Sequence, residues 1–165
     1  MAQLKLHGVQ REYCKIGLPP GRIIDNLMLR LRGGRGSGKT WANLIRATNH
    51  CLAYPGSWGL IVALINDNHR ITIIPKLEAI WDMAGFKRGY HYEYNKNDRE
   101  YTLHLSDEAD CKIFLRTAEE PKKLPGPDLA FYLLDEWSQM VEEVHTGLVP
   151  TLRQDNPLHP DMPHW

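Results

Sequence analysis

A glycine-rich segment has the residue types and spacing of a phosphate-binding loop: Gly33-Gly34-Arg35-Gly36-Ser37-Gly38-Lys39-Thr40. It matches G-x-x-x-x-G-K-[ST], in which glycines let the backbone bend so that several N–H groups point at phosphate oxygens. Lys39 can reach the β- and γ-phosphates, and the Thr40 hydroxyl can ligate Mg²⁺. The spacing therefore predicts a nucleotide site rather than a glycine-rich turn with a surface lysine.

Two adjacent acids, Asp135 and Glu136, follow an apolar run over 129–134. In enzymes with a phosphate loop, such an Asp holds Mg²⁺ together with the Ser or Thr of the loop. A neighbouring Glu can orient and deprotonate the attacking water. The alternative is an ordinary strand followed by a helix-capping Asp. The upstream loop favours the catalytic interpretation, and the Asp-Glu pair favours hydrolysis over kinase-type transfer.

The elements that must position these residues alternate between strands and helices. Apolar runs predict strands over 23–31, 58–65 and 129–134, and the residue pattern predicts helices over 39–53, 69–84 and 137–147. Residues 1–18 can form a short helix that leads to a turn at Pro19-Pro20-Gly21. Alternation from Tyr90 predicts an antiparallel hairpin, with 111–115 as its third strand. The last stretch, 150–165, is proline-rich and reads as irregular. This order is typical of an α/β fold with a mainly parallel sheet.

Composition narrows the function classes. The chain has 165 residues, with 20 Lys plus Arg against 20 Asp plus Glu, which disfavours a strongly basic DNA-coating protein. Three separated cysteines without C-x-x-C spacing argue against a disulfide framework and a zinc site. The eight histidines lack metal-binding spacing. The longest apolar run has strand length, so we expect no membrane partner.

Two further sequence segments upstream of Asp135 and Glu136 resemble those of a known protein family. They are Ile113-Phe114-Leu115-Arg116-Thr117-Ala118 and Leu124-Pro125-Gly126-Pro127-Asp128-Leu129-Ala130, which lead into Leu134-Asp135-Glu136. With the arginine inside the phosphate loop, they resemble the ATPase domain of the large terminase subunit, the DNA-packaging motor of tailed bacteriophages and prophages. The resemblance runs from about residue 7 to residue 165.

The resemblance implies a P-loop NTPase fold of the ASCE or RecA-like type, a three-layer sandwich to which the hairpin is added. We expect residues 1–165 to form a partial ATPase domain, incomplete at its C-terminus and without the family's coupling motif and nuclease domain. Two departures stand out. Leu124-Pro125-Gly126 replaces the usual Leu-Arg-Gly, and Trp137 stands where a small residue is common.

The resemblance also assigns roles to residues outside the glycines. Gln10 matches the glutamine that reads the adenine edge, for which an amide offers both a donor and an acceptor. Arg35 matches the arginine that contacts the γ-phosphate. In some members an arginine from a neighbouring subunit serves instead, and Arg88, Arg99 and Arg116 are all candidates.

The implied function is that of an ATP-hydrolysing motor that drives double-stranded DNA into a viral procapsid, with ATP and Mg²⁺ as cofactors. The implied partners are the portal, the small terminase subunit and further copies in a ring, in the host bacterial cytoplasm. Two alternatives stay open. One is a P-loop helicase or recombination ATPase, and the other is a nucleotide-binding remnant without turnover.

Overall fold

The computed structural model describes residues 8–15, 28, 30–34, 36–119, 121, 124 and 126–165. Its helices are α1 (Gly8–Lys15), α2 (Lys39–Ala53), α3 (Asn66–Asn68), α4 (Ile74–Met83) and α5 (Glu142–Leu148). Its strands are β1 (Trp58–Ala63), β2 (Tyr92–Asn95), β3 (Glu100–Leu103), β4 (Cys111–Thr117) and β5 (Phe131–Leu134). The expected helix over 39–53 is confirmed with both bounds.

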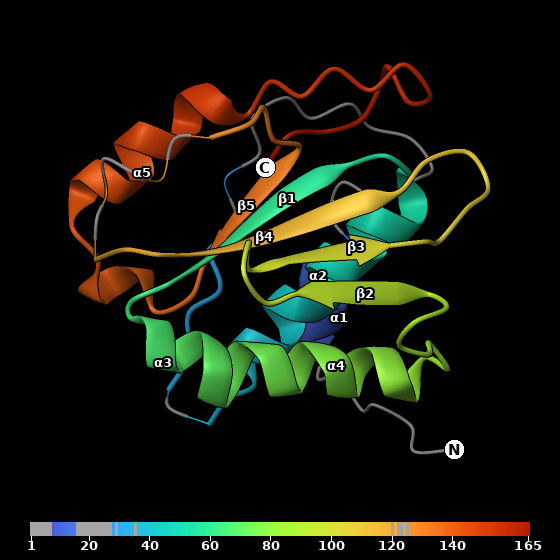
Figure 1. Cartoon of the computed structure of the whole chain (residues 1–165). Coiled ribbons are helices and arrows are strands. Elements are labelled where there is room, and N and C mark those ends of the chain that lie inside the picture. The colour runs from blue at the N-terminus through green and yellow to red at the C-terminus, as the bar shows by residue number, and fades with distance from the viewer. Residues whose placement is uncertain are drawn as a thin grey trace.

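The strands form one sheet in the order β2-β3-β4-β1-β5 (Figure 1). β1 lies between β4 and β5 and runs parallel to both, with Leu60 opposite Phe114 and Tyr132. β3 is antiparallel to β4 and to β2. The carboxyl ends of β1, β4 and β5 therefore meet at one edge of the sheet, which is where open α/β sheets bind their ligands.

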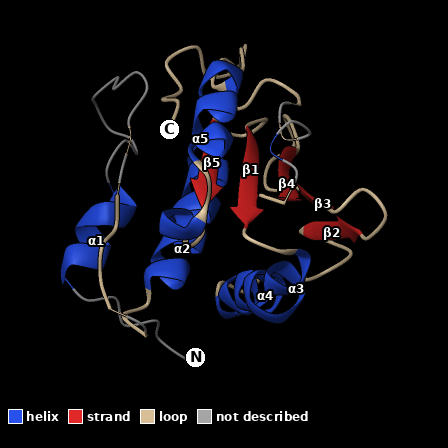
Figure 2. Cartoon of the chain, turned by 90° about the vertical axis from the view of Figure 1, so that its left-hand side faces the viewer, coloured by secondary structure: helices blue, strands red, loops and turns tan. Residues whose placement is uncertain are grey.

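Each face of the sheet is covered by helices, because alternate residues of a strand point to opposite sides. α2 and α4 pack on one face, and α5 packs on the other (Figure 2). The indole N–H of Trp81 on α4 donates to Oγ1 of Thr48 on α2 at 3.0 Å and joins the two helices. The first face buries Ile61, Ile113, Leu115 and Leu133, and the second buries Leu60, Val62 and Phe114. The predicted three-layer α/β fold is confirmed.

Close packing in the sheet explains why residue 59 is a glycine. A Cβ on Gly59 of β1 would overlap the aromatic ring of Phe131 on the neighbouring β5. Phe131 in turn stacks on Trp165, with ring centroids 4.7 Å apart. The absence of a side chain at residue 59 therefore lets a large ring lie across two strands.

The prediction of 111–115 as part of an antiparallel unit was incomplete. β4 runs over Cys111–Thr117 and pairs parallel with β1 along its whole length, in addition to its antiparallel pairing with β3. Local alternation shows that a segment is extended, but not which distant strand lies on its other side. The hairpin is therefore attached to an interior strand of the sheet.

Two predicted helices differ from the expectation. The segment 69–84 stays helical up to α4, but its first part, His69–Ile73, is a π-helical turn that runs directly into α4 just before Pro75. The segment 137–147 consists of a 3₁₀ turn over Trp137–Gln139 and then α5. Met140 and Val141 between them have extended backbones, with ψ of 152° at each.

Residues 150–165 are largely irregular, as predicted, and are anchored to the sheet. The Gln154 side chain accepts from the backbone N–H of Trp58 at 2.6 Å. Trp165 lies on the outer edge of β5, where its N–H donates to the carbonyl of Ala130 at 3.1 Å. Most of the expected strand over 23–31 lies outside the described residues. Within the described part of the chain, no helix has the length and apolarity needed to cross a membrane.

Candidate nucleotide-phosphate site

The described part of the phosphate loop has the backbone that its glycines permit. Gly36 and Gly38 both have φ of 78°, in the left-handed region that glycine adopts readily. Lys39 folds back over the loop, and its Nζ donates to the carbonyls of Gly33 at 2.8 Å and Gly34 at 2.9 Å. Its ammonium group therefore lies on the loop, within reach of a phosphate bound there.

The loop leads directly into the amino end of α2. Gly38 is the residue before the helix, no side chain among the described residues caps it, and the first turn contains no acid. The first N–H groups of a helix lack intrahelical partners, and the helix dipole makes this end positive. The beginning of α2 is thus suited to an anion such as a phosphate.

Thr40 and Asp135 meet at the carboxyl edge of the sheet. The Thr40 hydroxyl, on the first turn of α2, donates to Oδ1 of Asp135 at 3.0 Å, just beyond β5. Mg²⁺ prefers oxygen ligands and is commonly held by one or two protein oxygens together with water and phosphate. This donor pair fits Mg²⁺ with a nucleotide. Elsewhere in the described ranges, no group of three or more His, Cys, Asp or Glu residues gathers as a metal site would require.

The surroundings of Asp135 disfavour its negative charge. Burial raises the pKa of the Asp135 carboxyl above its usual value, and the nearby Glu136 carboxylate raises it further. The hydrogen bond from Thr40 and the charges of Lys76 and Lys39 act in the opposite direction. A buried carboxylate with incomplete compensation is a good ligand for a cation, since a cation relieves the cost of its charge.

Glu136 stands in an unusual backbone conformation. Its φ of 59° and ψ of 37° lie in the left-handed region, which costs a residue with a side chain roughly 1–2 kcal/mol. The exposed side chain accepts a hydrogen bond at Oε2 from Nε2 of Gln139 at 3.1 Å. Strained backbones persist where the surrounding structure fixes them, often at functional sites.

Gln10 lies against the phosphate loop. It is on α1, only 8% exposed, and its Nε2 donates to the carbonyl of Ser37 at 2.8 Å. α1 is attached to α2 by a bond from the Arg46 guanidinium to the carbonyl of Tyr13 at 2.7 Å. The structure thus brings Gln10 to the loop, while its role in reading adenine stays a prediction.

A cavity of about 670 Å³ adjoins the loop and the two acids. Lys39, Asp135 and Glu136 line one part of it, and the outer edge of β5 with Trp137 and Trp165 lines another. The cavity is large enough for a nucleotide-sized ligand, since such sites measure about 300–1,000 Å³.

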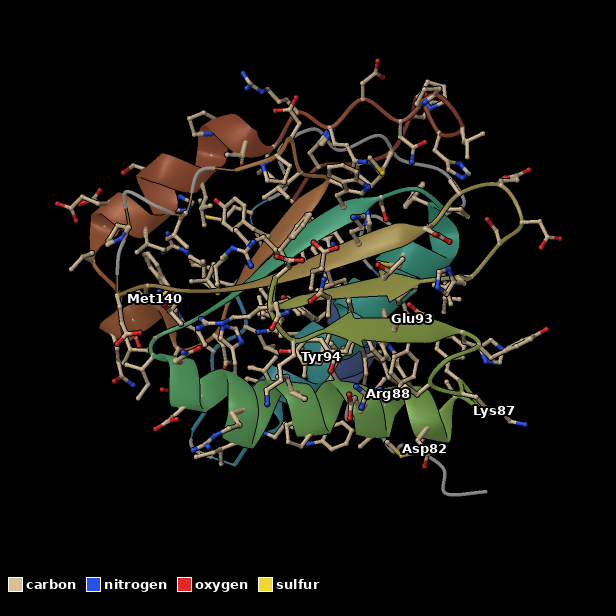
Figure 3. The ribbon with its side chains drawn as sticks, viewed as in Figure 1. Asp82, Lys87, Arg88, Glu93, Tyr94 and Met140 are labelled. Carbon is tan, nitrogen blue, oxygen red and sulfur yellow. The ribbon has the colours of Figure 1, made fainter. Side chains whose placement is uncertain are left out.

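The candidate arginines lie in different places. Arg35 is outside the described residues. Arg116, at the end of β4, donates to the carbonyl of Asp98 at 3.0 Å in the turn between β2 and β3, which ties it to the hairpin. Arg88 approaches Glu78 at 3.9 Å. Figure 3 shows Arg88 beside β2 and α4.

Sequence reasoning missed two neighbours of the acids. Lys76, on α4, lies close enough to Asp135 to affect its pKa, although nothing in the sequence indicated that α4 approaches β5. Gln139 could have been found, because a side chain three residues after Glu136 lies on the same side of a helical turn.

These elements define a class of fold. The features of a P-loop NTPase are a phosphate loop that enters a helix, a mainly parallel sheet, and an acid that follows a neighbouring strand and pairs with the loop Thr. The chain has this fold, and among solved structures it is similar to the ATPase domains of phage large terminases.

Three solved structures illustrate the likeness. The large terminase of a thermophilic bacteriophage matches with a TM-score of 0.72 at 16% identity, over 92% of this chain and 36% of that one. The same terminase in complex with ATP-gamma-S matches with a TM-score of 0.60 at 16% identity, over 74% and 29%. A mutant of the Thermus phage P74-26 large terminase ATPase domain matches with a TM-score of 0.51 at 22% identity, over 72% and 53%.

At these identities the likeness establishes a shared fold. The chain spans about half the length of the Thermus phage domain and about a third of the other terminase. No protein-family model and no curated protein matches the sequence. The resemblance seen in the sequence is therefore confirmed by structures at the level of fold.

Proposed function

We propose that this chain is the ATP-hydrolysing domain of a large terminase, which drives double-stranded DNA into a viral procapsid. The hydrogen bond of 3.0 Å between Thr40 and Asp135 carries the proposal. It joins the end of the phosphate loop to the acid that follows β5, and it places Glu136 beside the pair. A glycine-rich surface turn without a phosphate-binding role would not be expected to contact a buried acid.

Each residue has a distinct part in hydrolysis. Backbone N–H groups of 34–39 hold the phosphates at the amino end of α2. Lys39 exchanges the loop carbonyls for β- and γ-phosphate oxygens. Glu136 orients the attacking water and accepts its proton. Mg²⁺, which Thr40 and Asp135 would hold, supplies charge neutralisation at the phosphates.

The remaining parts of the proposal rest on the likeness to large terminases. They are double-stranded DNA as the moving partner, assembly as a ring of copies on a portal, delivery by a small terminase subunit, and action in the host cytoplasm. Arg35, or an arginine of a neighbouring copy, would stabilise the charge that develops on the γ-phosphate.

The test is ATP hydrolysis by the parent chain and by Glu136→Gln, with and without DNA. The variant keeps the size and hydrogen-bonding capacity of residue 136 but removes the base. We expect hydrolysis to fall about 100-fold or more, with ATP binding retained. The matched control is Glu143→Gln, an exposed acid on α5, which should hydrolyse at the parent rate.

The outcomes separate the candidate functions. Parent-rate hydrolysis by Glu136→Gln would refute Glu136 as the base. Stimulation by single-stranded but not double-stranded DNA would favour a helicase or recombination ATPase. Tight ATP binding by the parent chain with no phosphate release would favour a nucleotide-binding remnant.

A further inference from the structure

The turn after β5 brings a glutamine and the proposed base into contact. Trp137–Gln139 form a 3₁₀ turn in which the backbone N–H of Gln139 donates to the carbonyl of Glu136 at 2.9 Å. The N–H of Met140 donates to the carbonyl of Trp137 at 3.0 Å. Residues three apart are eclipsed in such a turn, so the side chains of Glu136 and Gln139 lie on the same side.

The two side chains make a directed contact. Nε2 of Gln139 donates to Oε2 of Glu136 at 3.1 Å. Hydrogen bonds to an ionised acceptor are stronger and more directional than those between neutral groups. No hydrogen bond from the described residues engages the other oxygen, Oε1. One carboxylate oxygen is therefore held, and the other is available to a water.

Trp137, which lies between Glu136 and Gln139 in the chain, contacts the segment before the phosphate loop and helix α5. The guanidinium of Arg30, which leads into the phosphate loop, lies 4.9 Å from the centre of the Trp137 ring. The same ring lies 6.1 Å from that of His145 on α5. His145 is hydrogen-bonded to the hydroxyl of Tyr132 at 2.8 Å. These contacts, none of which involves the Gln139 side chain, join the turn to the segment before the phosphate loop and to α5.

We propose that Gln139 is a positioning residue for Glu136, whose side-chain amide holds one carboxylate oxygen so that the other faces the attacking water. The proposal rests on ATP hydrolysis as proposed above. The left-handed backbone of Glu136 aims the side chain, and the Gln139 amide selects its rotamer. Orientation of a catalytic group affects the chemical step rather than substrate binding, so kcat is the parameter that changes.

The kinetic test uses two variants of nearly equal size. Gln139→Met keeps the shape of the side chain and removes the donor. Gln139→Glu keeps the shape and replaces the donor with a second carboxylate, which repels Glu136. We expect kcat to fall twofold to tenfold for Gln139→Met and further for Gln139→Glu, with KM for ATP within twofold of the parent. Glu143→Gln serves again as the control at the parent rate.

The pattern of results distinguishes positioning from a structural role. A purely structural role of Gln139 would lower the melting temperature and change KM in its variants. It would not make kcat lower for Gln139→Glu than for Gln139→Met. A Gln139→Met variant with the parent kcat would overturn the proposal, provided that Glu136→Gln is inactive. If Glu136→Gln is active instead, the proposed base is wrong and the fault lies with the proposed function.

A second measurement is independent of turnover. The side-chain NH₂ group of Gln139 gives its own ¹⁵N–¹H NMR signals, which respond to hydrogen bonding. We expect these signals to shift in Glu136→Ala and to stay unchanged in Glu143→Ala. Identical Gln139 signals in the parent and Glu136→Ala would show that the two side chains do not bond, and the proposal would be refuted.

Discussion

Two glycines of the phosphate loop form a natural matched pair for testing the position of Gln10. Gly36 and Gly38 share a φ of 78°, so alanine at either position must adopt a left-handed backbone. Their surroundings differ. A Cβ on Gly36 would meet nothing within 4 Å, whereas a Cβ on Gly38 would lie 2.6 Å from Nε2 of Gln10. Gly38→Ala must therefore displace the Gln10 amide, and Gly36→Ala must not.

The magnitudes follow from two contributions. The left-handed backbone costs alanine roughly 1–2 kcal/mol at either position. Displacement of the Gln10 amide breaks its 2.8 Å bond to Ser37, which adds about 0.5–1.5 kcal/mol at Gly38 only. We expect Gly38→Ala to destabilise the protein by about 1 kcal/mol more than Gly36→Ala, or about 0.5 M in the urea midpoint at an m value of roughly 2 kcal/mol/M.

The assay is urea unfolding without nucleotide, so that stability alone is measured. The same two substitutions are then repeated in a Gln10→Ala background, which removes the amide that the new Cβ would strike. In that background the two variants should lose equal stability, because only the backbone strain remains. An extra loss at Gly38 that persists without the Gln10 amide would refute the reasoning, as would equal losses in its presence.

Three further outcomes are expected. Gly59→Ala should destabilise the protein by about 2–3 kcal/mol in urea unfolding with an unchanged m value, because its Cβ overlaps Phe131 in the interior of the sheet. Burial lowers the pKa of His50 to about 3, so below pH 6.5 the unfolded state binds a proton that the folded state does not. Stability should then fall as pH falls, by about 2 kcal/mol between pH 6.5 and 5 relative to His50→Gln, measured by unfolding at each pH. Lys39→Ala should weaken ATP binding about 10- to 100-fold in calorimetry, because a charge-assisted bond to phosphate is lost, whereas exposed Lys87→Ala should not change it.

The sequence predicted the elements whose signals are local. The glycine loop, the helix over Lys39–Ala53 and the strand that ends before Asp135 carry their own periodicity and breakers, and the structure has them. The pairing of β4 with β1 could not be predicted, because it depends on which strands meet in space. The break after Gln139 was missed because Met140 and Val141 are compatible with a helix in isolation, whereas the chain is extended there.

The residues of the candidate site likewise divide into those that the sequence predicted and those that only the fold reveals. The motif spacing predicted Lys39, Thr40 and Asp135, and folding brings the last two within 3.0 Å of each other. The approach of Lys76 depends on how α4 crosses the sheet, which no local pattern encodes. The contact between Gln10 and the loop was indicated only through the family resemblance, since a lone glutamine on a short helix carries no signal of its own.

The amino end of α2 has a consequence for the protein without nucleotide. A helix that begins at a glycine, with no capping side chain among the described residues, loses only a few tenths of a kcal/mol relative to a Ser, Thr or Asp cap. The absence of an acid from its first turn removes roughly a further 0.3–1 kcal/mol. Its first turn should therefore fray when no nucleotide is bound, and a bound phosphate would act as the missing cap. Amide hydrogens of 39–41, which precede the first intrahelical bond from Ala42 to Gly38, should exchange with solvent rapidly in the free protein and slowly with ATP bound. The ligand would then complete the secondary structure of the helix that binds it.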